Sequence, residues 1–285
     1  MKKALKINEF SHKSVLSNPK DFLAEALQDL CEAWALGLTF FTRDLKAQYR
    51  LSFLGLFWST IPPLVFVIGF SVAAKANIIN FGDTPIPYPA FAMVSIMIWH
   101  LFQSCVEAPI LAFKDAKPLI GRLRFSVESI FISKIYMVLF NLVIKAIFVA
   151  AALIYFEIPI GWGAFNAFFP LISLMIFGLF LGVLLAPITL LIDDVAQGLK
   201  FFMTFWMIAT PVAYVIDRSS EHYGYMVFNP AAALVATLRE NLLSLPLNYE
   251  TPFYIVTILG LVGLICAWLA AKIALPFITE RAGTV

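Results

Sequence analysis

The sequence predicts an all-α integral membrane protein with six transmembrane helices, and three observations lead to this fold class. Of the 285 residues, 61% are hydrophobic and only 13% are charged, whereas a soluble domain carries about 25% charged residues. Apolar stretches long enough to cross the roughly 30 Å hydrocarbon core recur along the whole chain. Lysine and arginine gather in alternate connections between these stretches. No soluble domain fits between them.

The apolar stretches predict the positions of the spans and their direction. The predicted spans cover residues 53–74, 89–113, 127–156, 164–192, 199–216 and 252–272. The cations between the second and third spans are Lys114, Lys117, Arg122 and Arg124, and eight more precede the first span. The alternate connections hold only Lys75, Arg218 and Arg239. Because cytoplasmic loops are enriched in Lys and Arg, we expect both termini in the cytosol.

Residues 21–41 predict an amphipathic helix before the first span. Its apolar positions recur at helical spacing and are Leu23, Leu27, Leu30, Trp34, Leu38 and Phe41. Glu25, Asp29 and Glu32 lie on the other face. Since the next element already lies in the membrane, we interpret this segment as a helix along the cytosolic membrane surface with a free acidic face. Packing of the apolar face on the rest of the chain is the alternative.

The stretch RDLKAQYRLSFLGLFWSTIPPLVF, residues 43–66, leads from this helix into the first span without a turn signal. Its cations, Arg43, Lys46 and Arg50, fall at the level of the lipid headgroups, where they are favourable. Pro62-Pro63 removes two backbone donors inside the predicted span, so we expect a bend there. The bent face then packs on protein or lines a cavity, and a kink without a role is the alternative.

A re-entrant helical hairpin is predicted between the fifth and sixth spans. The segment VFNPAAALVATLRENLLSLP, residues 227–246, is only partly apolar and carries Arg239 and Glu240. A charge at the bilayer centre costs about 2.5–3.5 kcal/mol, which argues against a full span exposed to lipid. We therefore expect the hairpin to enter from the outer side under a cover of protein. A seventh span would also move the C-terminus outside.

Few residues point to covalent or metal chemistry. The chain has no GxxxxGK[ST] phosphate loop, no HExxH and no paired cysteine ligands, so we expect it to hydrolyse no ATP itself and to bind no metal. Cys31, Cys105 and Cys266 are interpreted as free thiols. Lys145 lies well inside the third span, where an ionisable side chain is a functional candidate by default. The alternative is that Lys145 extends towards the outer interface.

Aromatic stripes are candidates for lining a passage. Two adjacent helical stripes in the fifth span consist of Phe201, Phe202, Phe205 and Trp206, and Trp58, Phe66 and Phe70 continue along the first span. Flat aromatic faces suit the C–H faces of sugar rings, and plain packing is the alternative for each residue. The loop FKDAKPLIGRLRF, residues 113–125, interleaves cations with Leu119, Ile120 and Leu123. This pattern favours a short helix that docks into a groove on a protein partner.

Together, several local patterns resemble the polysaccharide-exporting permeases of the type-2 ABC transporter family, which includes O-antigen, capsule and teichoic-acid exporters. The resemblance covers residues 21–285. The patterns that carry it are RDLKAQYRLSFLGLFW, DAKPLIGRLRF, PVAY at 211–214, FNPAAALVATLRENLL at 228–243 and FITERAGTV. The chain departs from the family at Phe125-Ser126, where Phe-Pro is frequent, and at Asp193-Asp194, where Arg-Asp is frequent.

The resemblance implies a dimer of two six-span permeases with two ATP-binding cassette subunits. It places a coupling helix for the ATPase at Lys117, Leu119, Arg122 and Arg124. It places Asn229, Pro230 and Arg239 in the outer hairpin. ATP and Mg would be bound by the partner ATPase, and no cofactor by this chain.

The expected function is therefore that of the transmembrane permease subunit of an ATP-driven exporter of lipid-linked polysaccharide, in the bacterial cytoplasmic (inner) membrane. The expected parts are a cytosolic tail (1–20), an amphipathic interface helix with its connection (21–50) and a six-span permease domain (51–285). The expected partners are a second copy, the ATPase, the lipid-linked polysaccharide and membrane lipid, without nucleic acid.

Two other functions fit the sequence less well. An integral-membrane enzyme acting on lipid-linked sugars would need convergent His, Asp or Glu residues at one membrane face, and the sequence offers only the isolated pair Asp193-Asp194. A secondary transporter is disfavoured because the two halves show no evident repeat and no charged midplane pair beyond Lys145.

Overall fold

The computed structural model describes residues 19–49, 60–78, 82–116, 127–159, 161, 163–216 and 223–282, and the regular structure in these ranges is entirely helical. The helices are α1 (Pro19–Tyr49), α2 (Ile61–Lys75), α3 (Tyr88–Ala116), α4 (Val127–Tyr155), α5 (Gly163–Asn166), α6 (Phe168–Leu191), α7 (Asp193–Ala209), α8 (Tyr223–Val227), α9 (Pro230–Leu242) and α10 (Glu250–Ala282).

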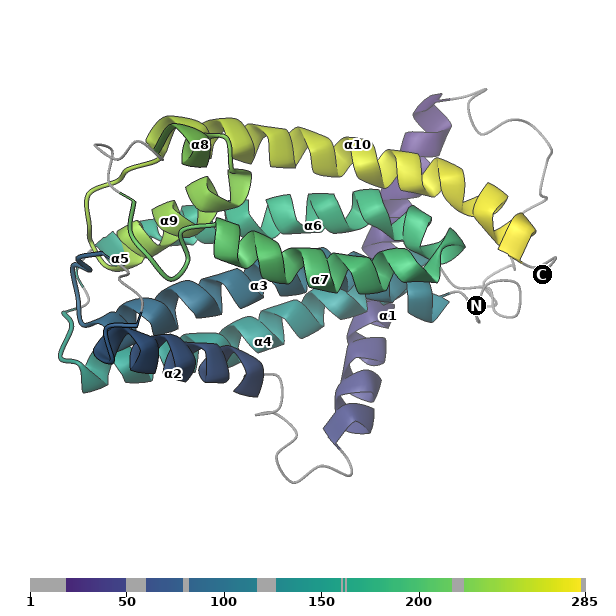
Figure 1. Ribbon diagram of the computed structural model, residues 1–285. Helices are drawn as coiled ribbons and strands as arrows, with labels where there is room; N and C mark the ends of the chain where they lie inside the picture. The colour runs from purple at the N-terminus through teal and green to yellow at the C-terminus, as the bar shows by residue number, and fades with distance from the viewer. Residues whose placement is uncertain are drawn as a thin grey trace.

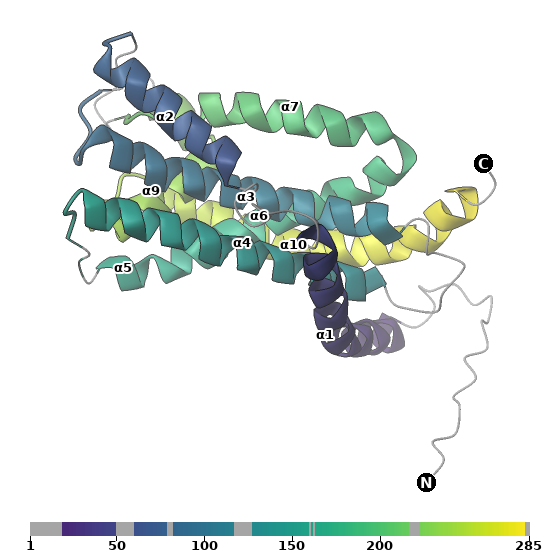
Figure 2. The same ribbon diagram turned by 90° about the horizontal axis from the view of Figure 1, so that it is seen from below.

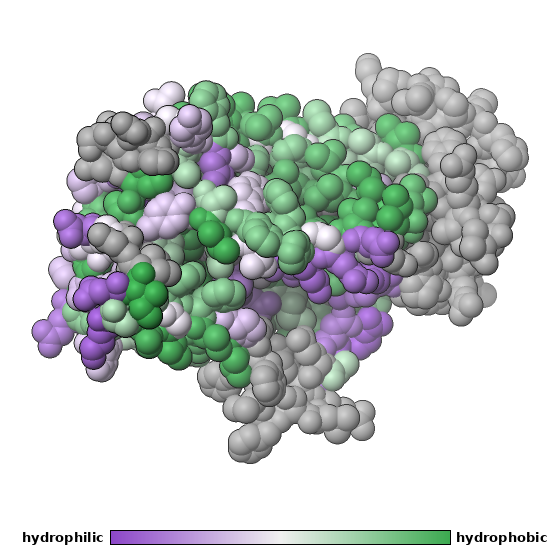
Figure 3. Space-filling view, in the orientation of Figure 1, coloured by the Kyte–Doolittle hydropathy of each residue, from purple (hydrophilic) through white to green (hydrophobic). Residues whose placement is uncertain are grey.

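The long helices α3, α4, α6 and α10 form a bundle, and α1 crosses one end of it (Figure 1). The short helices α5, α8 and α9 lie at the opposite end. We call these the α1 end and the α9 end. Helices α2 and α7 both lie on one side of the bundle, as Figure 2 shows. In the space-filling view, hydrophobic side chains cover much of the middle of the molecule, and hydrophilic side chains gather towards its ends (Figure 3).

Four described helical segments are long and apolar enough to cross a membrane: Tyr88–Ala116, Glu128–Tyr155, Gly163–Leu191 and Glu250–Ala274. They correspond to the second, third, fourth and sixth predicted spans. The chain is therefore an all-helical, multi-pass membrane protein. The first predicted span is described only from Thr60 onwards, and its helix α2 has 15 residues.

Two details differ from the sequence prediction. Pro62 and Pro63 occupy the first turn of α2, where a missing N–H donor costs little because the first turn has no intrahelical acceptor for it. Helix α7 begins at Asp193 and ends at Ala209, whereas the fifth span was predicted at 199–216. The residues after Ala209 form turns and irregular structure.

The centre of the bundle is the contact between α3 and α6. A Cβ atom added at Gly178 would lie 2.6 Å from the Cβ of Cys105, and one added at Gly182 would lie 2.8 Å from the Cγ of Pro109. These glycines are one turn apart on α6, so they let its backbone approach α3 closely, as small residues do in membrane helix pairs. On α10, Gly263 likewise allows a close contact with the ring of Phe180 of α6.

Replacement of Gly182 should therefore weaken the bundle. In Gly182→Leu the new side chain has no room against α3, and overpacking of this kind costs about 1–3 kcal/mol. We expect a lower thermal midpoint for the detergent-purified protein. Gly69→Leu is the matched control, because nothing lies within 4 Å of a Cβ at Gly69. Equal midpoints for the two variants would contradict the close α3–α6 contact.

Candidate functional site

Helix α1 lies across α4 through small residues. Ala33 is fully buried, and a Cβ added at Gly37 would lie 2.7 Å from the Cγ2 of Ile132 on α4. The rings of Trp34 and Phe41 each lie 5.8 Å from the ring of Tyr136. The face of α1 that packs on the bundle is thus centred on Ala33 and Gly37. Part of the expected apolar stripe packs on the chain itself, as the alternative interpretation had it.

An ion-pair cluster joins α1 to α4 and α10. Lys272 Nζ on α10 lies 2.8 Å from Asp29 Oδ2 on α1 and 3.0 Å from Glu128 Oε1 on α4. The Lys272 side chain is only 18% exposed and that of Glu128 only 14%. We call these three residues the Lys272 clasp.

A second cluster joins α1 to α3 and α4. Lys134 Nζ on α4 lies 2.6 Å from Asp115 Oδ2 on α3 and 3.3 Å from Asp44 Oδ2 on α1. Arg43 adds an ion pair of 2.7 Å to Asp44. The Lys134 side chain is 15% exposed. We call Lys134, Asp115 and Asp44 the Lys134 clasp.

The clasps change the interpretation of the acidic face of α1. Asp29 was expected to be free, but it pairs with Lys272 of the same chain. Glu32 is exposed and accepts a hydrogen bond of 3.0 Å from Gln28. The side chain of Glu25 lies outside the described part of the structure, and so do all four residues of the predicted coupling helix: Lys117, Leu119, Arg122 and Arg124.

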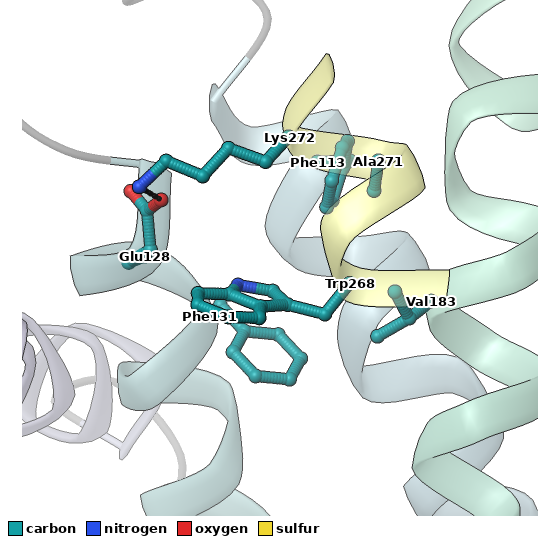
Figure 4. Close-up of a pocket in the computed structure, with 7 residues that line it drawn as sticks. All are labelled: Phe113, Glu128, Phe131, Val183, Trp268, Ala271 and Lys272. Carbon is teal, nitrogen blue, oxygen red and sulfur yellow. Dashed lines mark ion pairs between the residues drawn. The ribbon is translucent and has the colours of Figure 1, made fainter. Parts of the chain in front are cut away.

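A small pocket lies beside the Lys272 clasp, between α3, α4, α6 and α10 (Figure 4). Its lining residues are Phe113, Glu128, Phe131, Val183, Trp268, Ala271 and Lys272. Lys272 and Glu128 point towards each other at one side, and Lys272 Nζ lies 5.8 Å from the centroid of the Trp268 ring. The cavity volume is about 40 Å³, enough for a few water molecules at most. This pocket is a packing feature of the α1 end and too small for a sugar.

The predicted aromatic stripes have different environments. The rings of Phe66 and Phe70 on α2 lie 6.2 Å apart, and Phe66 also lies 6.3 Å from His100 of α3. On α7, Phe201 and Phe205 are exposed, with ring centroids 4.6 Å apart. Helices α2 and α7, which carry these residues, lie on the same side of the bundle (Figure 2). Trp58 lies outside the described residues.

Trp206 belongs to the packing of the bundle. Its Nε1 donates a 3.0 Å hydrogen bond to Asn229 Oδ1, and its ring contacts Trp99 and Phe102 of α3 edge-on at 5.9 and 5.5 Å. With its donor bound and its ring half-buried, Trp206 joins α7 to α3 and to the start of α9. For this member of the aromatic stripe, the packing alternative describes the structure.

Asn229 and Pro230 begin α9. Asn229 is the N-cap, and its Oδ1 accepts from the Ala231 N–H at 3.1 Å. Its Nδ2 donates to Thr210 Oγ1 at 3.0 Å, at the end of α7. Pro230 occupies the first helical position, where its missing N–H is not needed. Asn229 thus fixes where α9 starts relative to α7.

Arg239 and Glu240 are both buried near the end of α9, and each binds a different part of the chain. The Arg239 guanidinium donates to Ser95 Oγ at 3.2 Å and to the Pro211 carbonyl at 3.0 Å. It also lies 4.4 Å from the centroid of the Phe91 ring. Glu240 accepts two 2.9 Å hydrogen bonds, from the backbone N–H and the side-chain amide of Asn248. Every residue from 231 to 240 is buried, so α9 is covered by protein. That α9 enters from the outer side of a membrane stays a prediction.

Lys145 lies between α3 and α4 with only 6% of its surface exposed, so its side chain does not extend to the surface. Glu107 of α3 is the nearby acidic side chain. Glu107 also accepts a 3.0 Å hydrogen bond from Gln103. Lys145 is the only charged residue among those lining a cavity of about 620 Å³ between α3, α4, α6 and α9. The structure thus provides Glu107 as a countercharge for an ionisable group inside the bundle.

A double-mutant cycle tests this pairing. Lys145→Met should destabilise the protein because Glu107 loses its countercharge, and adding Glu107→Gln should recover part of the loss. We expect an interaction free energy of about 0.5–3 kcal/mol from thermal or denaturant unfolding in detergent. Lys75→Met is the control, since Lys75 is exposed. Additive effects of the two substitutions would show that Lys145 and Glu107 do not interact.

Comparison with known proteins agrees with these features. No family model matches the chain. The O-antigen export system permease protein RfbA of Myxococcus xanthus is 28% identical over 221 residues, which cover 74% of this chain and 81% of that protein. Two proteins of the same name from Klebsiella pneumoniae are 24% identical, over 73% and 77% of this chain and 80% and 86% of those proteins. These similarities confirm the predicted resemblance: the chain is a multi-pass membrane protein similar to O-antigen export permeases over most of its length.

Proposed function

We propose that this chain is the transmembrane permease subunit of an ATP-driven exporter of lipid-linked polysaccharide. The observation that carries the proposal is the similarity to three O-antigen export permeases over at least 73% of this chain and 80% of theirs. The chain supplies a path through the membrane and no covalent chemistry. ATP hydrolysis belongs to a separate partner subunit, and two copies of the permease assemble with two copies of that partner.

In this proposal the chain crosses the bacterial inner membrane six times. The four long apolar helices supply four spans. Helices α2 and α7 belong to the other two. Both termini and the α1 end then face the cytosol by the positive-inside rule, and the α9 end faces outwards with α8 and α9 as a re-entrant hairpin.

The geometry supports this direction. Helix α1 lies across the bundle at the end where α3 and α4 flank residues 117–126, so both elements expected to meet the ATPase are at one end. The buried helix α9 is at the other end, where it can close the path. Movement of the ATPase subunits towards each other would reach the spans through the α1 end. The exposed aromatic residues of α2 and α7 share one side of the bundle and are the part of the path suited to sugar rings.

Charge reversal in the coupling loop tests docking of the ATPase. Arg122→Glu with Arg124→Glu should reduce co-purification of the ATPase subunit and polymer-stimulated ATP hydrolysis in the reconstituted pair. Loss of a buried partner costs about 3–5 kcal/mol and loss of an exposed one about 0–1 kcal/mol. We expect a value between these limits, and 1.4 kcal/mol lowers affinity tenfold.

Lys75→Glu is the control for this test, because Lys75 lies in α2 and outside the loop. Unchanged recovery and turnover in the loop variant would remove residues 117–126 from the coupling role. Absence of any ATPase partner for the unmodified protein would overturn the exporter proposal itself.

Removal of the exposed aromatic rings tests the path. The triple variant Trp58→Ala, Phe201→Ala and Phe205→Ala should impair polymer export while abundance and ATPase binding stay normal, since the rings would contact the glycan rather than the core. Tyr155→Ala is the matched control, because Tyr155 is an exposed aromatic residue at the end of α4. Full export by the triple variant would show that these rings only contact lipid or protein.

A further inference from the structure

The two lysine clasps lie on either side of the predicted coupling loop. Asp115 stands two residues before the segment 117–126, at the end of α3, and Glu128 stands two residues after it, at the start of α4. We call the last turn of α3 and the first turn of α4 the stems of this segment. Each stem therefore carries one carboxylate next to the point where the chain leaves the bundle.

Both stem carboxylates are tied to α1 through a lysine. The Lys134 clasp joins the α3 stem to Asp44, and the Lys272 clasp joins the α4 stem to Asp29. A lysine ammonium has three donors, so one side chain can hold two carboxylates from different helices. The four carboxylates come from three separate parts of the sequence, and each clasp holds one from α1 and one from a stem.

The spacing of the clasps fixes the orientation of α1. Asp29 and Asp44 are 15 residues apart on one helix, which is about 22 Å at 1.5 Å per residue. Gly37 meets α4 between these two points. A helix held at one point can pivot, but one held at two distant points with a close contact between them can neither pivot nor slide without breaking an ion pair.

The lysines at the centre of the clasps are less exposed than those of ordinary surface ion pairs. Exposed pairs contribute about 0–1 kcal/mol because water and salt screen them. Here Lys272, Glu128 and Lys134 are each less than 20% exposed. Removing either lysine would also leave two neighbouring carboxylates to repel each other. Each clasp therefore holds α1 on the bundle through one central lysine.

We propose that α1 and both stems form one rigid docking platform for the ATP-hydrolysing subunit, with Lys134 and Lys272 as its positioning residues. This inference rests on the proposed function, because the partner is the ATPase of that exporter. A push on α1 or on the segment 117–126 then moves α3, α4 and α10 together. The lysines make no contact with the transported molecule in this role; they keep the two docking elements in a constant relation.

The first experiment measures the joint directly in the full-length permease, without its partner. Spin labels at Ala35 of α1 and Val143 of α4, both exposed positions, report the distance between the helices in a background without the three native cysteines. We expect a narrow distance distribution in the parent protein and a broad one in Lys134→Met with Lys272→Met. Replacement of both lysines by arginine should restore the narrow distribution.

The second experiment measures coupling in the complex. The double methionine variant should export several-fold less polymer for each ATP hydrolysed while still co-purifying with the ATPase. The double arginine variant should recover this ratio. Lys46→Met is the control, since Lys46 also lies on α1 but is exposed and forms no ion pair with any described residue. A purely stabilising role would lower abundance without changing the ratio.

Two results would overturn the proposal. A distance distribution that stays narrow in the double methionine variant would show that the clasps do not hold α1. A broadened distribution with an unchanged export ratio would show that the joint has no part in coupling. If the proposed function is wrong, the parent permease binds no ATPase. The distance measurement still shows whether the clasps hold α1, so the two failures can be told apart. If the double variant does not accumulate, Lys272→Met and Asp29→Asn separately carry the same test.

Discussion

The contact between α3 and α6 at Gly178 and Gly182 is the constraint on which the rest of the structure depends. Lipid tails are as apolar as the side chains of a membrane helix, so burial alone gives no force that brings two such helices together. Close packing of backbones can provide it, and α6 has glycines where it meets α3. With α6 fixed in this way, α10 packs on the other side of α6 and α4 on α3. The positions of the four long helices therefore depend on this one contact.

The two ends of the bundle hold their shorter elements by different physics. At the α1 end, Asp29, Asp44 and Asp115 are partly open to solvent, and the lysines that bind them are shielded. At the α9 end, Arg239 and Glu240 are shielded completely and bind mainly neutral hydrogen-bonding groups. Salt can reach the first arrangement but not the second. The ion pairs of the α1 end are therefore sensitive to ionic strength, and the buried hydrogen bonds of the α9 end are not.

The sequence was sufficient for the long apolar helices because each has an uninterrupted hydrophobic signal longer than the bilayer requires. It misplaced the start of α7, since Asp193-Asp194 reads as part of a polar connection. Acidic residues are also favourable in the first turn of a helix, where they meet the positive end of its dipole. The acidic pair is compatible with a polar connection and with the first turn of a helix, and only packing in the bundle decides between them.

The contacts of individual site residues could not be predicted, because their partners are distant in the chain. Asp29 lies 243 residues from Lys272, and Arg239 lies 144 residues from Ser95. The amphipathic pattern of residues 21–41 identified a helix, but the small residues Ala33 and Gly37, which meet α4, carry no hydrophobic signal. The N-cap at Asn229 was also not predicted, although capping depends only on neighbours within one turn.

The neighbouring residues Arg239 and Glu240 also set an order for biogenesis. Synthesis proceeds from the N-terminus, so Ser95 and Pro211 have already been made when Arg239 is added. Both acceptors of the guanidinium are then present. Asn248, which donates to Glu240, is made later and lies two residues before α10. Until then Glu240 lacks the two hydrogen bonds that Asn248 donates. The α9 end therefore gains its last hydrogen bonds only after residue 248 has been made.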